Sequence, residues 1–528
     1  MAALVLGIDV GTTSTKVVLA DPAAGVVAQA SEPVALSSPH PGWAEADPAQ
    51  WWANLAALVP AVLAAASAAS GEHITAADIA AVATTGMVPA VIPVDHDGRP
   101  LRGAILQNDA RATTEIRELA AALPDLDFVA RTGSALTQQS VGPTLLWLAR
   151  HEPDAWAAAA TVQGSYDWLA TRLGAAPRVE RNWALESGLF ELEPDGALTP
   201  LHPVRDALAS LAGIKPEVIP PVADPGTVIG EVSRGAAAET GLRPGTPIVA
   251  GGADHVLSAY AAGLASPGDW LVKLGGAGDI LVVSGYPLVD ERLYLDAHPV
   301  TGLWLPNGCM ATSGSLIRWF QSVSGTAANP VPVAELEAEA IAARGAELIC
   351  LPYFLGEKSP LHDPDLRGAF LGLHLGHTRG DLYRSILEGI AYGFRHHAEI
   401  FAERRVALRP TARVSNGGSK SVVWKQILAD ALGVALEPVL DHPGAALGAA
   451  LAAAVGTGAG GTGAGGTGTP PPQAWAAAAS VPGMVTIGAP IEPDPAHAAR
   501  YAEAYQVYRD AGAALTPISH RLATRRTS

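Results

Sequence analysis

The sequence predicts an α/β protein with two large domains. Its 528 residues are too many for a single hydrophobic core, and 49% of them are hydrophobic, which is enough to fill two. Short β-like segments alternate with longer helical ones, an order typical of an α/β fold. A strand, a glycine-rich turn and a second strand open the chain and occur again near residue 275. This echo indicates that one hairpin-bearing unit is duplicated.

The first half alternates between the two kinds of element. Asp47 and Pro48 predict a helix start, because aspartate caps helices well and proline is accommodated at the first helical position. Pro60 is expected to kink that helix. In chain order, the predicted elements are strands at residues 4–10, 15–21 and 25–34, a helix at 49–66, strands at 79–86 and 90–95, and a helix at 112–123.

A second cycle of strands and helices begins near Thr246, so we predict domains at residues 1–245 and 246–520. A flexible glycine-rich loop is predicted at 456–473, and residues 520–528 are expected to fray. In chain order, the predicted elements are strands at 246–252, 270–274 and 279–285, helices starting at 255 and 380, a strand at 411–418, and helices at 419–433, 442–456 and 494–515.

The charge balance and the cysteine content exclude several classes of protein. Lysine and arginine total 34 against 51 aspartates and glutamates, a net charge of −17. Such a surface repels nucleic acid and anionic membranes, so neither is an expected partner. Cys309 and Cys350 are too few for a disulfide framework. Met1 precedes no basic and apolar leader, and the apolar segment 55–69 is shorter than a membrane span. A cytoplasmic protein is expected.

The turn in GIDVGTTSTK, residues 7–16, has the composition of a phosphate-binding site. Backbone N–H groups of a Gly/Thr/Ser turn can hold phosphate oxygens, and Thr12 and Thr13 add hydroxyl donors. Lys16 supplies positive charge, and Asp9 at the strand end supplies the carboxylate that Mg²⁺ favours beside phosphate oxygens. A plain hairpin turn with surface threonines is the alternative. The segment matches neither GxxxxGK[ST] nor GxGxxG.

Asp254 in GGADHVLSAYAAG, residues 251–263, follows two glycines and precedes a helical segment. It is expected either to cap the helix or to act as a general base that takes a proton from a substrate hydroxyl. The two roles are compatible. The glycines would let a substrate approach the backbone closely.

SNGGSKS, residues 415–421, lies between a predicted strand and a predicted helix. Such a loop can hold a flat adenine or an α-phosphate at the helix N-terminus, and a tight strand-to-helix turn is the alternative.

Taken together, the motifs resemble the FGGY family of carbohydrate kinases, which belongs to the actin-like ATPase superfamily. The resemblance covers nearly the whole chain. The segments that carry it are GIDVGTTSTK, PGWAEADPAQWW, GGADHVLSAYAAG, LPYFLGEKSPLHDPDLRGAFLGL with HTRGDLYRSILEGIAYG, SNGGSKSVVWKQILADALG, and EPDP followed by YAEAYQVYRD.

The resemblance implies two RNase H-like domains with ATP, Mg²⁺ and a sugar meeting in the cleft between them. It implies that Asp254 is the catalytic base and that Asp9 is associated with the metal. The implied nucleotide-binding residues are Thr12, Thr13, Lys16, Gly275, Gly276, Gly314, Gly417, Gly418 and Ser421. The implied substrate-binding residues are Met87, Asp109, Arg111, Asp254 and His255. For Asp109 and Arg111, a salt link within their loop is the alternative.

The chain departs from the family pattern at four places. The second phosphate turn reads GGAG, residues 275–278, where many members have Gly-Thr-Ser. Val88 stands where xylulokinases commonly have histidine, and His255 follows the catalytic aspartate where other residues are often found. The segment around Glu180 departs from the family's Asp-x-Ser pattern. The last three changes concern the sugar pocket and therefore the substrate, while the reaction class is unaffected.

The expected activity is ATP-dependent phosphorylation of a sugar hydroxyl, most readily that of a ketopentose such as D-xylulose. Kinases of another pentulose, a tetrose or a polyol are open alternatives. A non-catalytic sugar or nucleotide sensor would lack Asp9 or Asp254, and both are present. An ATPase of the chaperone or filament type would lack the sugar-side elements around Met87 and Asp109. The sequence leaves open whether the protein is a monomer or a homodimer.

Overall fold

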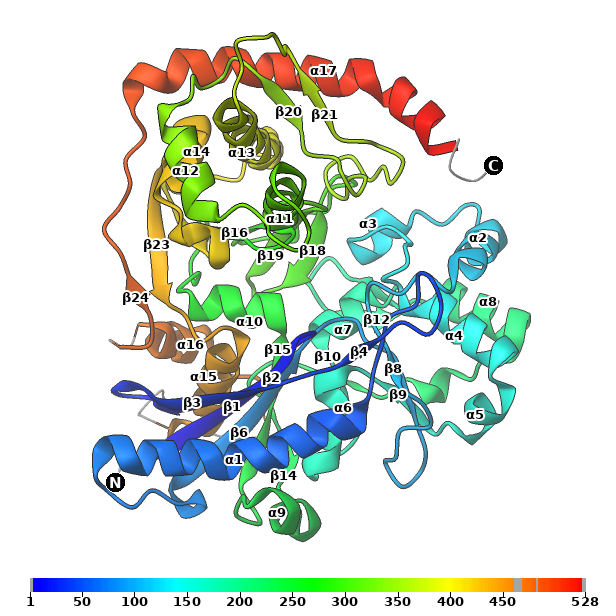
Figure 1. Cartoon of the computed structure of the whole chain (residues 1–528). Helices are drawn as coiled ribbons and strands as arrows, with labels where there is room; N and C mark the ends of the chain where they lie inside the picture. The colour runs from blue at the N-terminus through cyan, green and yellow to red at the C-terminus, as the bar shows by residue number, and fades with distance from the viewer. Residues whose placement is uncertain (1–2, 460–467, 481–482, 525–528) are drawn as a thin grey trace.

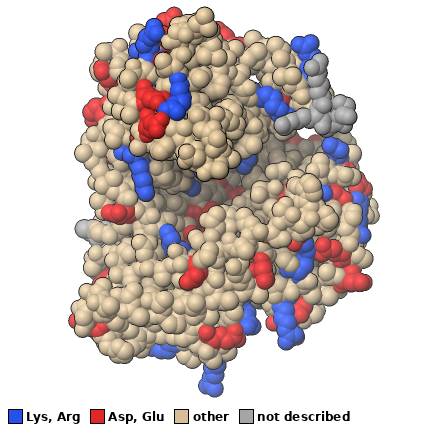
Figure 2. Space-filling model, in the orientation of Figure 1, with Lys and Arg blue, Asp and Glu red and all other residues tan. Residues whose placement is uncertain are grey.

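Two β-sheets form the centres of two lobes (Figure 1). The computed structural model describes residues 3–459, 468–480 and 483–524. The space-filling view shows the cleft as a hollow that crosses the molecule, with carboxylates at its floor (Figure 2). Both the mixed α/β composition and the two-domain arrangement predicted from the sequence are confirmed.

The first sheet has the order β14-β15-β6-β1-β2-β3. Its centre is an antiparallel meander of β1 (Leu4–Val10), β2 (Ser14–Asp21) and β3 (Gly25–Pro33). Strand β6 (Ile79–Gly86) runs parallel to β1, and β15 (Pro247–Ala253) runs parallel to β6. Strand β14 (Val228–Glu231) pairs antiparallel with β15 at the edge.

The second sheet repeats this arrangement. Strands β16 (Trp270–Leu274), β17 (Gly278–Val282) and β19 (Trp304–Met310) form the antiparallel meander. Strand β22 (Thr411–Ser415) is parallel to β16, and β23 (Ala435–Asp441) is parallel to β22. The duplication predicted from the two glycine-turn hairpins is therefore present in the topology. The edges carry β18 (Tyr294–Ala297) and β24 (Thr486–Ile487).

The position of β15 corrects the predicted domain boundary. Residues 246–252 were predicted to open the second domain, but β15 hydrogen-bonds to β6 and β14 in the first sheet. The sequence could not show this, because a strand that returns to a sheet after a long insertion looks the same locally as one that begins a new sheet. The first sheet is complete only at Ala253, and the second begins at Trp270.

Helices cover both faces of the first sheet. Helix α1 (Pro48–Ser70) begins as predicted, with the Asp47 carboxylate accepting the Ala49 N–H, and it continues through Pro60. By length and composition alone α1 could span a membrane. In the structure its apolar face, which includes Trp51, packs against the first sheet. The opposite face is covered by α10 (Asp254–Ala261) and α15 (Ala445–Thr457).

The other elements lie between the strands of the two sheets or follow the last of these strands. In the first half they are β4 (Leu36–Ser37), β5 (Glu45–Ala46), β7 (Ile92–Val94), β8 (Ala104–Ile105), α2 (Thr113–Ala122), α3 (Phe128–Thr132), α4 (Val141–His151), α5 (Pro153–Ala158), β9 (Thr161–Gln163), α6 (Ser165–Leu173), β10 (Val179–Glu180), α7 (Arg181–Glu186), β11 (Phe190–Leu192), β12 (Leu198–Pro200), α8 (His202–Ala212), β13 (Val222–Ala223) and α9 (Arg234–Thr240). In the second half they are α11 (Gly314–Ser324), α12 (Val333–Ala342), β20 (Ile349–Leu351), β21 (Ala369–Leu371), α13 (Arg379–Glu403), α14 (Val422–Leu432), α16 (Pro472–Ala479) and α17 (Ala498–Thr524).

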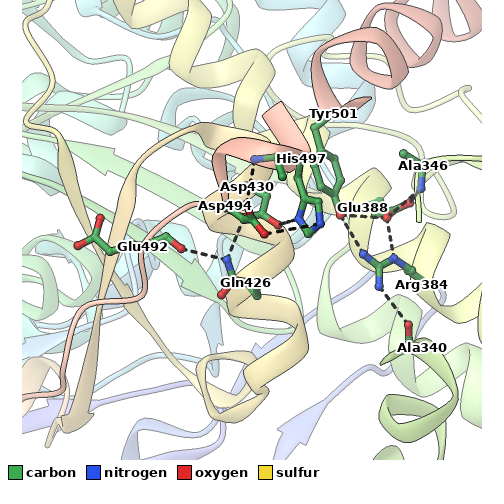
Figure 3. Close-up of polar contacts among 11 residues, drawn as sticks. Ala340, Ala346, Arg384, Glu388, Gln426, Asp430, Glu492, Asp494, His497 and Tyr501 are labelled. Carbon is green, nitrogen blue, oxygen red and sulfur yellow. Dashed lines mark hydrogen bonds and ion pairs between the residues drawn. The ribbon is translucent and has the colours of Figure 1, made fainter. Parts of the chain in front are cut away.

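A polar network fastens the C-terminal helix α17 to the second lobe (Figure 3). Tyr501 of α17 donates its hydroxyl hydrogen to Glu388 of α13 at 3.1 Å, and Arg384 donates to the same carboxylate at 3.0 Å. Beside them, His497 lies 2.7 Å from Asp430 of α14. The C-terminal segment thereby holds α13 and α14 together.

The end of the chain is more ordered than the sequence predicts. Residues 520–528 were expected to fray, but α17 extends to Thr524 and His520 lies 2.7 Å from Asp363. The predicted glycine-rich loop at 456–473 overlaps the end of α15 and the start of α16. Its central part, 460–467, and the last residues, 525–528, lie outside the described residues.

Candidate active site

A cavity of about 270 Å³ lies in the cleft, and both lobes contribute to its wall. Asp254 and His255, at the start of α10, are part of this wall. The other lining residues are Val88, Gln107, Ser134, Ala135, Thr137, Gln139, Ser140 and Glu186 from the first half and Lys273, Asp279, Leu281, Tyr294, Asp296, Asn307, Cys309 and Lys358 from the second. Charged and polar side chains predominate, as a sugar or phosphate ligand requires.

Asp254 is the first residue of α10 and follows β15 directly. Ala253, not Asp254, occupies the N-cap position. The Asp254 carboxylate accepts the N–H of His255 at 2.6 Å and remains partly exposed in the cavity wall. Only a glycine fits at position 251, because a Cβ there would lie 1.9 Å from the carbonyl oxygen of Thr84 in the neighbouring strand β6. That glycine therefore serves strand packing and not the substrate approach expected from the sequence.

The first hairpin places Asp9 and Lys16 opposite each other, in register on β1 and β2. Burial, and next the charge of Asp254, raises the pKa of Asp9 to about 8, and the charges of Lys16 and Lys273 oppose that rise. The charge of Asp254 therefore acts on the Asp9 carboxyl group. Asp9 Oδ1 is buried with no hydrogen-bond partner among the described residues, so it is free to accept a bond from a ligand.

Lys16 links the first hairpin to the C-terminal half of the chain. Its ammonium group donates to the carbonyl oxygen of Pro443 at 3.0 Å, in the loop that precedes α15. Thr12 and Thr13 lie in the turn itself, where Thr13 is exposed and its carbonyl oxygen accepts the N–H of Val34. The turn is thus anchored on one side and open on the other.

The second hairpin turn lies against the start of α11. The Gly314 N–H donates to the carbonyl oxygen of Gly275 at 2.8 Å, and the Ser313 N–H donates to that of Gly276 at 2.9 Å. A Cβ on Gly275 would also lie 3.2 Å from the side-chain amide of Asn416. The structure therefore brings together three glycine-containing segments that are far apart in the sequence.

Gly417 and Gly418 lie in a 3-10 turn, residues Gly417–Lys420, between β22 and α14. A Cβ on Gly418 would lie 2.4 Å from the Trp424 ring, whereas a Cβ on Gly417 would meet no atom within 4 Å. Ser421 caps α14, because its hydroxyl oxygen accepts the Trp424 N–H at 3.1 Å. Gly418 and Ser421 thus build the loop, and Gly417 leaves open space beside it.

His255 contacts carboxylates through both ring nitrogens. Its Nε2 lies 2.7 Å from Asp296 Oδ2, and its Nδ1 lies 3.5 Å from Asp254 Oδ1. Burial lowers the pKa of His255, but Asp296, Asp254 and Glu186 outweigh that effect and raise the pKa well above its ordinary value. These carboxyl groups therefore favour the protonated form of the ring.

The remaining predicted sugar contacts lie behind the cavity wall. Met87 is buried in the core of the first lobe, and its neighbour Val88 lines the cavity. Asp109 and Arg111 form the salt link that was the alternative prediction, with Arg111 also bonded to Glu45 and packed 3.8 Å from the Trp43 ring centroid. Neither side chain lines the cavity. A sugar-binding role for these three residues stays a prediction.

The sequence reasoning did not single out several residues of the cavity wall. Lys273 and Asp279 lie on the two strands of the second hairpin, with 3.8 Å between ammonium nitrogen and carboxylate oxygen. Asp296 is a single acidic residue in an otherwise apolar strand, β18, and this was a usable signal of a buried polar role. Glu186, Asn307 and Lys358 carried no comparable local signal.

Sequence comparison adds a family assignment to this geometry. Residues 4–261 match the FGGY family of carbohydrate kinases, N-terminal domain, and residues 286–457 match its C-terminal domain. The chain belongs to the FGGY family of carbohydrate kinases. The expectation from the motifs is thereby confirmed, including the use of ATP as phosphate donor in this family. The match to the N-terminal domain also extends past the predicted boundary at residue 245.

Individual FGGY relatives are similar along most of the chain. A xylulose kinase of Staphylococcus epidermidis is 26% identical over 86% of this chain and 88% of its own length. An L-xylulose/3-keto-L-gulonate kinase of Escherichia coli is 30% identical with the same coverage. Among solved structures, a xylulose kinase from Rhodospirillum rubrum is 42% identical, with a TM-score of 0.84 over 98% of this chain and 100% of that one.

Proposed function

We propose that this FGGY kinase transfers the γ-phosphoryl group of ATP to a hydroxyl group of a ketopentose, with D-xylulose as the first candidate. The observation that carries the proposal is the position of Asp254, whose carboxylate faces a polar cavity between the two hairpin-bearing lobes. The relatives and the solved structure named as xylulose kinases support the choice of sugar.

The nucleotide would lie along the glycine segments of the cleft. Gly275, Gly276 and Gly314 meet at the second hairpin, and Gly417 offers open space for the adenosine. Thr12, Thr13 and Lys16 would receive the terminal phosphates from the first lobe. Because the second turn has no hydroxyl side chain, its backbone N–H groups would do the binding there.

Asp9 is suited to hold Mg²⁺, directly or through water, because it presents a buried carboxylate oxygen without a partner among the described residues. When bound, Mg²⁺ would neutralise charge on the phosphate oxygens. Lys16 and Lys273, which both act on Asp9 electrostatically, would supply further positive charge at the same place.

In the transfer step, the sugar hydroxyl oxygen forms a bond to the γ-phosphorus while the bond from that phosphorus to the β–γ bridging oxygen breaks. Asp254 accepts the hydroxyl proton, and ADP leaves. A positioned general base contributes roughly 10²–10⁴-fold to such a reaction. Closure of the two lobes would exclude water and limit ATP hydrolysis.

Asp254→Asn tests the assignment of the base. The variant should bind Mg²⁺–ADP as the wild type does, because Asp254 is not placed among the nucleotide contacts, while sugar-dependent ADP release should fall roughly 10²- to 10⁴-fold. Calorimetry and a coupled ADP-release assay measure the two properties. Near-wild-type turnover by the variant would show that Asp254 is not the base.

The sugar is tested with a panel in the same assay. D-xylulose should give the highest kcat/KM among ketopentoses, other pentuloses, tetroses and polyols. The E. coli relative named for 3-keto-L-gulonate makes that acid a useful comparison. ATP turnover that no sugar stimulates would favour a chaperone-type ATPase, and the absence of turnover with every sugar would favour a non-catalytic sensor. We also propose a cytoplasmic protein without nucleic acid or membrane partners, in line with the net charge of −17.

A further inference from the structure

Three acidic side chains from three elements surround His255 in the wall of the cavity. Asp254 precedes it on α10, Asp296 lies on β18, and Glu186 ends α7. Ligand atoms of Glu186, His255 and Asp296 all lie within 4.8 Å of one another. Residues far apart in the sequence therefore converge on His255, which stands where other residues are often found in the FGGY family.

The contact between His255 and Asp296 is a hydrogen bond, and a neighbouring side chain fixes the orientation of Asp296. Asp296 is 2% exposed, and its Oδ2 lies 2.7 Å from His255 Nε2. Asn307 of β19 donates its side-chain N–H to the same carboxylate oxygen at 2.7 Å. Because Asn307 also donates to the Leu305 carbonyl oxygen, Asp296 is held in one orientation. His255 Nδ1 is left facing Asp254 Oδ1 at 3.5 Å.

The charges around His255 determine its protonation. Burial, and next the charge of Asp296, raises the pKa of Glu186 well above its ordinary value. Asp296 and Asp254 face the ring of His255, one at each nitrogen. A ring between two acceptors must carry a proton on both nitrogens to donate to both.

We propose that Asp296 is a positioning residue for phosphoryl transfer, which holds His255 as an imidazolium whose Nδ1–H orients the Asp254 carboxylate toward the sugar hydroxyl. The inference rests on the proposed role of Asp254 as the base. It assigns Asp296 no contact with the reacting atoms, since Asp296 acts through His255.

Closure of the cleft would remove water from the Asp254 carboxylate, and the neighbouring imidazolium would compensate for that loss. A carboxylate that loses water becomes easier to protonate, and a protonated Asp254 could not accept the hydroxyl proton. An imidazolium at its side would offset that loss of water. In a chain without Asp296, His255 would titrate nearer to its ordinary range and would lose its positive charge beside Asp254 as the pH rises.

The decisive measurement is the pH dependence of kcat/KM for the best sugar in four variants. Asp296→Asn should lower kcat roughly 10- to 100-fold, as the loss of an orienting partner does elsewhere. It should also move the alkaline limb of the profile down by about one pH unit or more. Asp296→Glu, which keeps the carboxylate, should restore the alkaline limb. His255→Asn, which has no titrating ring, should lower kcat without shifting that limb to lower pH.

Asp363→Asn is the matched control, because Asp363 also lies 2.7 Å from a histidine, His520, but on the surface and outside the cavity wall. It should leave the profile unchanged. Each variant is first checked for wild-type Mg²⁺–ADP affinity by calorimetry. A destabilised fold would reduce that affinity, whereas loss of positioning would not.

The outcomes separate this inference from the proposed function. If Asp254→Asn is inactive while Asp296→Asn keeps the wild-type pH profile, the positioning role is wrong and the base assignment stands. If Asp254→Asn remains active, the base assignment fails, and this inference fails with it. A downward shift of the alkaline limb in Asp296→Asn, reversed in Asp296→Glu, supports the positioning role.

Discussion

Adjacent glycines in the loop before α14 have opposite surroundings. A side chain on Gly418 would overlap the Trp424 ring and the Leu274 side chain, because the loop packs directly on the second sheet at that point. Gly417 faces open space on the side where we place the nucleotide. One glycine therefore permits packing of the loop, and the other leaves room for a ligand.

Gly418→Ala should lower the free energy of unfolding by about 1–3 kcal/mol, the usual cost of overpacking, and should weaken ATP binding by displacing the loop. Gly417→Ala should change stability by less than about 0.5 kcal/mol while it raises the KM for ATP. Urea unfolding and ATP saturation curves measure both effects. Equal stability of the two variants would contradict the packing argument.

At the scale of the element, α17 secures the part of the second lobe that carries the loop of Gly417 and Gly418. Glu388 of α13 is 1% exposed and accepts hydrogen bonds from Arg384, Tyr501 and the Ala346 N–H. Asp430 of α14 accepts the Asp494 N–H at 2.8 Å and contacts His497 (Figure 3). The helix that follows the loop is thus fixed by the end of the chain.

Glu388→Ala should cost about 3–5 kcal/mol of unfolding free energy, because it leaves the mostly buried Arg384 guanidinium without its carboxylate. Tyr501→Phe removes a single hydrogen bond to the same carboxylate and should cost only about 1 kcal/mol. Urea denaturation followed by tryptophan fluorescence gives both values. If the two variants lose similar amounts, the ion pair is not what stabilises the helix contact.

At the scale of the whole molecule, both lobes contain buried histidines and glutamates, whose titration changes the stability of the fold with pH in opposite directions. Burial lowers the pKa of His298, His397 and His442 to about 4 each, and it raises that of Glu180 to about 8 and that of Glu357 to about 7. The histidines stabilise the fold above their unfolded pKa and lose that contribution as the pH falls. The two glutamates act in the reverse direction, so the effects must be separated by substitution.

For His397 the sign follows from its folded pKa of about 4 against about 6.5 when unfolded. Its contribution is complete above pH 6.5, falls between pH 6.5 and 4, and amounts to at most about 3 kcal/mol. The stability difference between the wild type and His397→Gln should therefore shrink by that order from pH 7.5 to pH 4.5. Urea unfolding at several pH values measures the difference. A constant difference would show that His397 does not titrate with unfolding.

The sequence by itself determined the fold class, the duplicated hairpin, the helix start at Asp47, and the segments that carry Asp9, Asp254 and Gly417. These depend on local rules of turns, caps and periodicity, or on ordered motifs, and such rules act within a few residues. Only the tertiary structure decided that β15 completes the first sheet and that Asp109 and Arg111 bind each other. The contacts of Asp296 with His255 and of Lys16 with Pro443 were likewise decided there. The physical reason is that strand pairing and buried charge pairs join residues tens to hundreds of positions apart, where no local pattern specifies the partner.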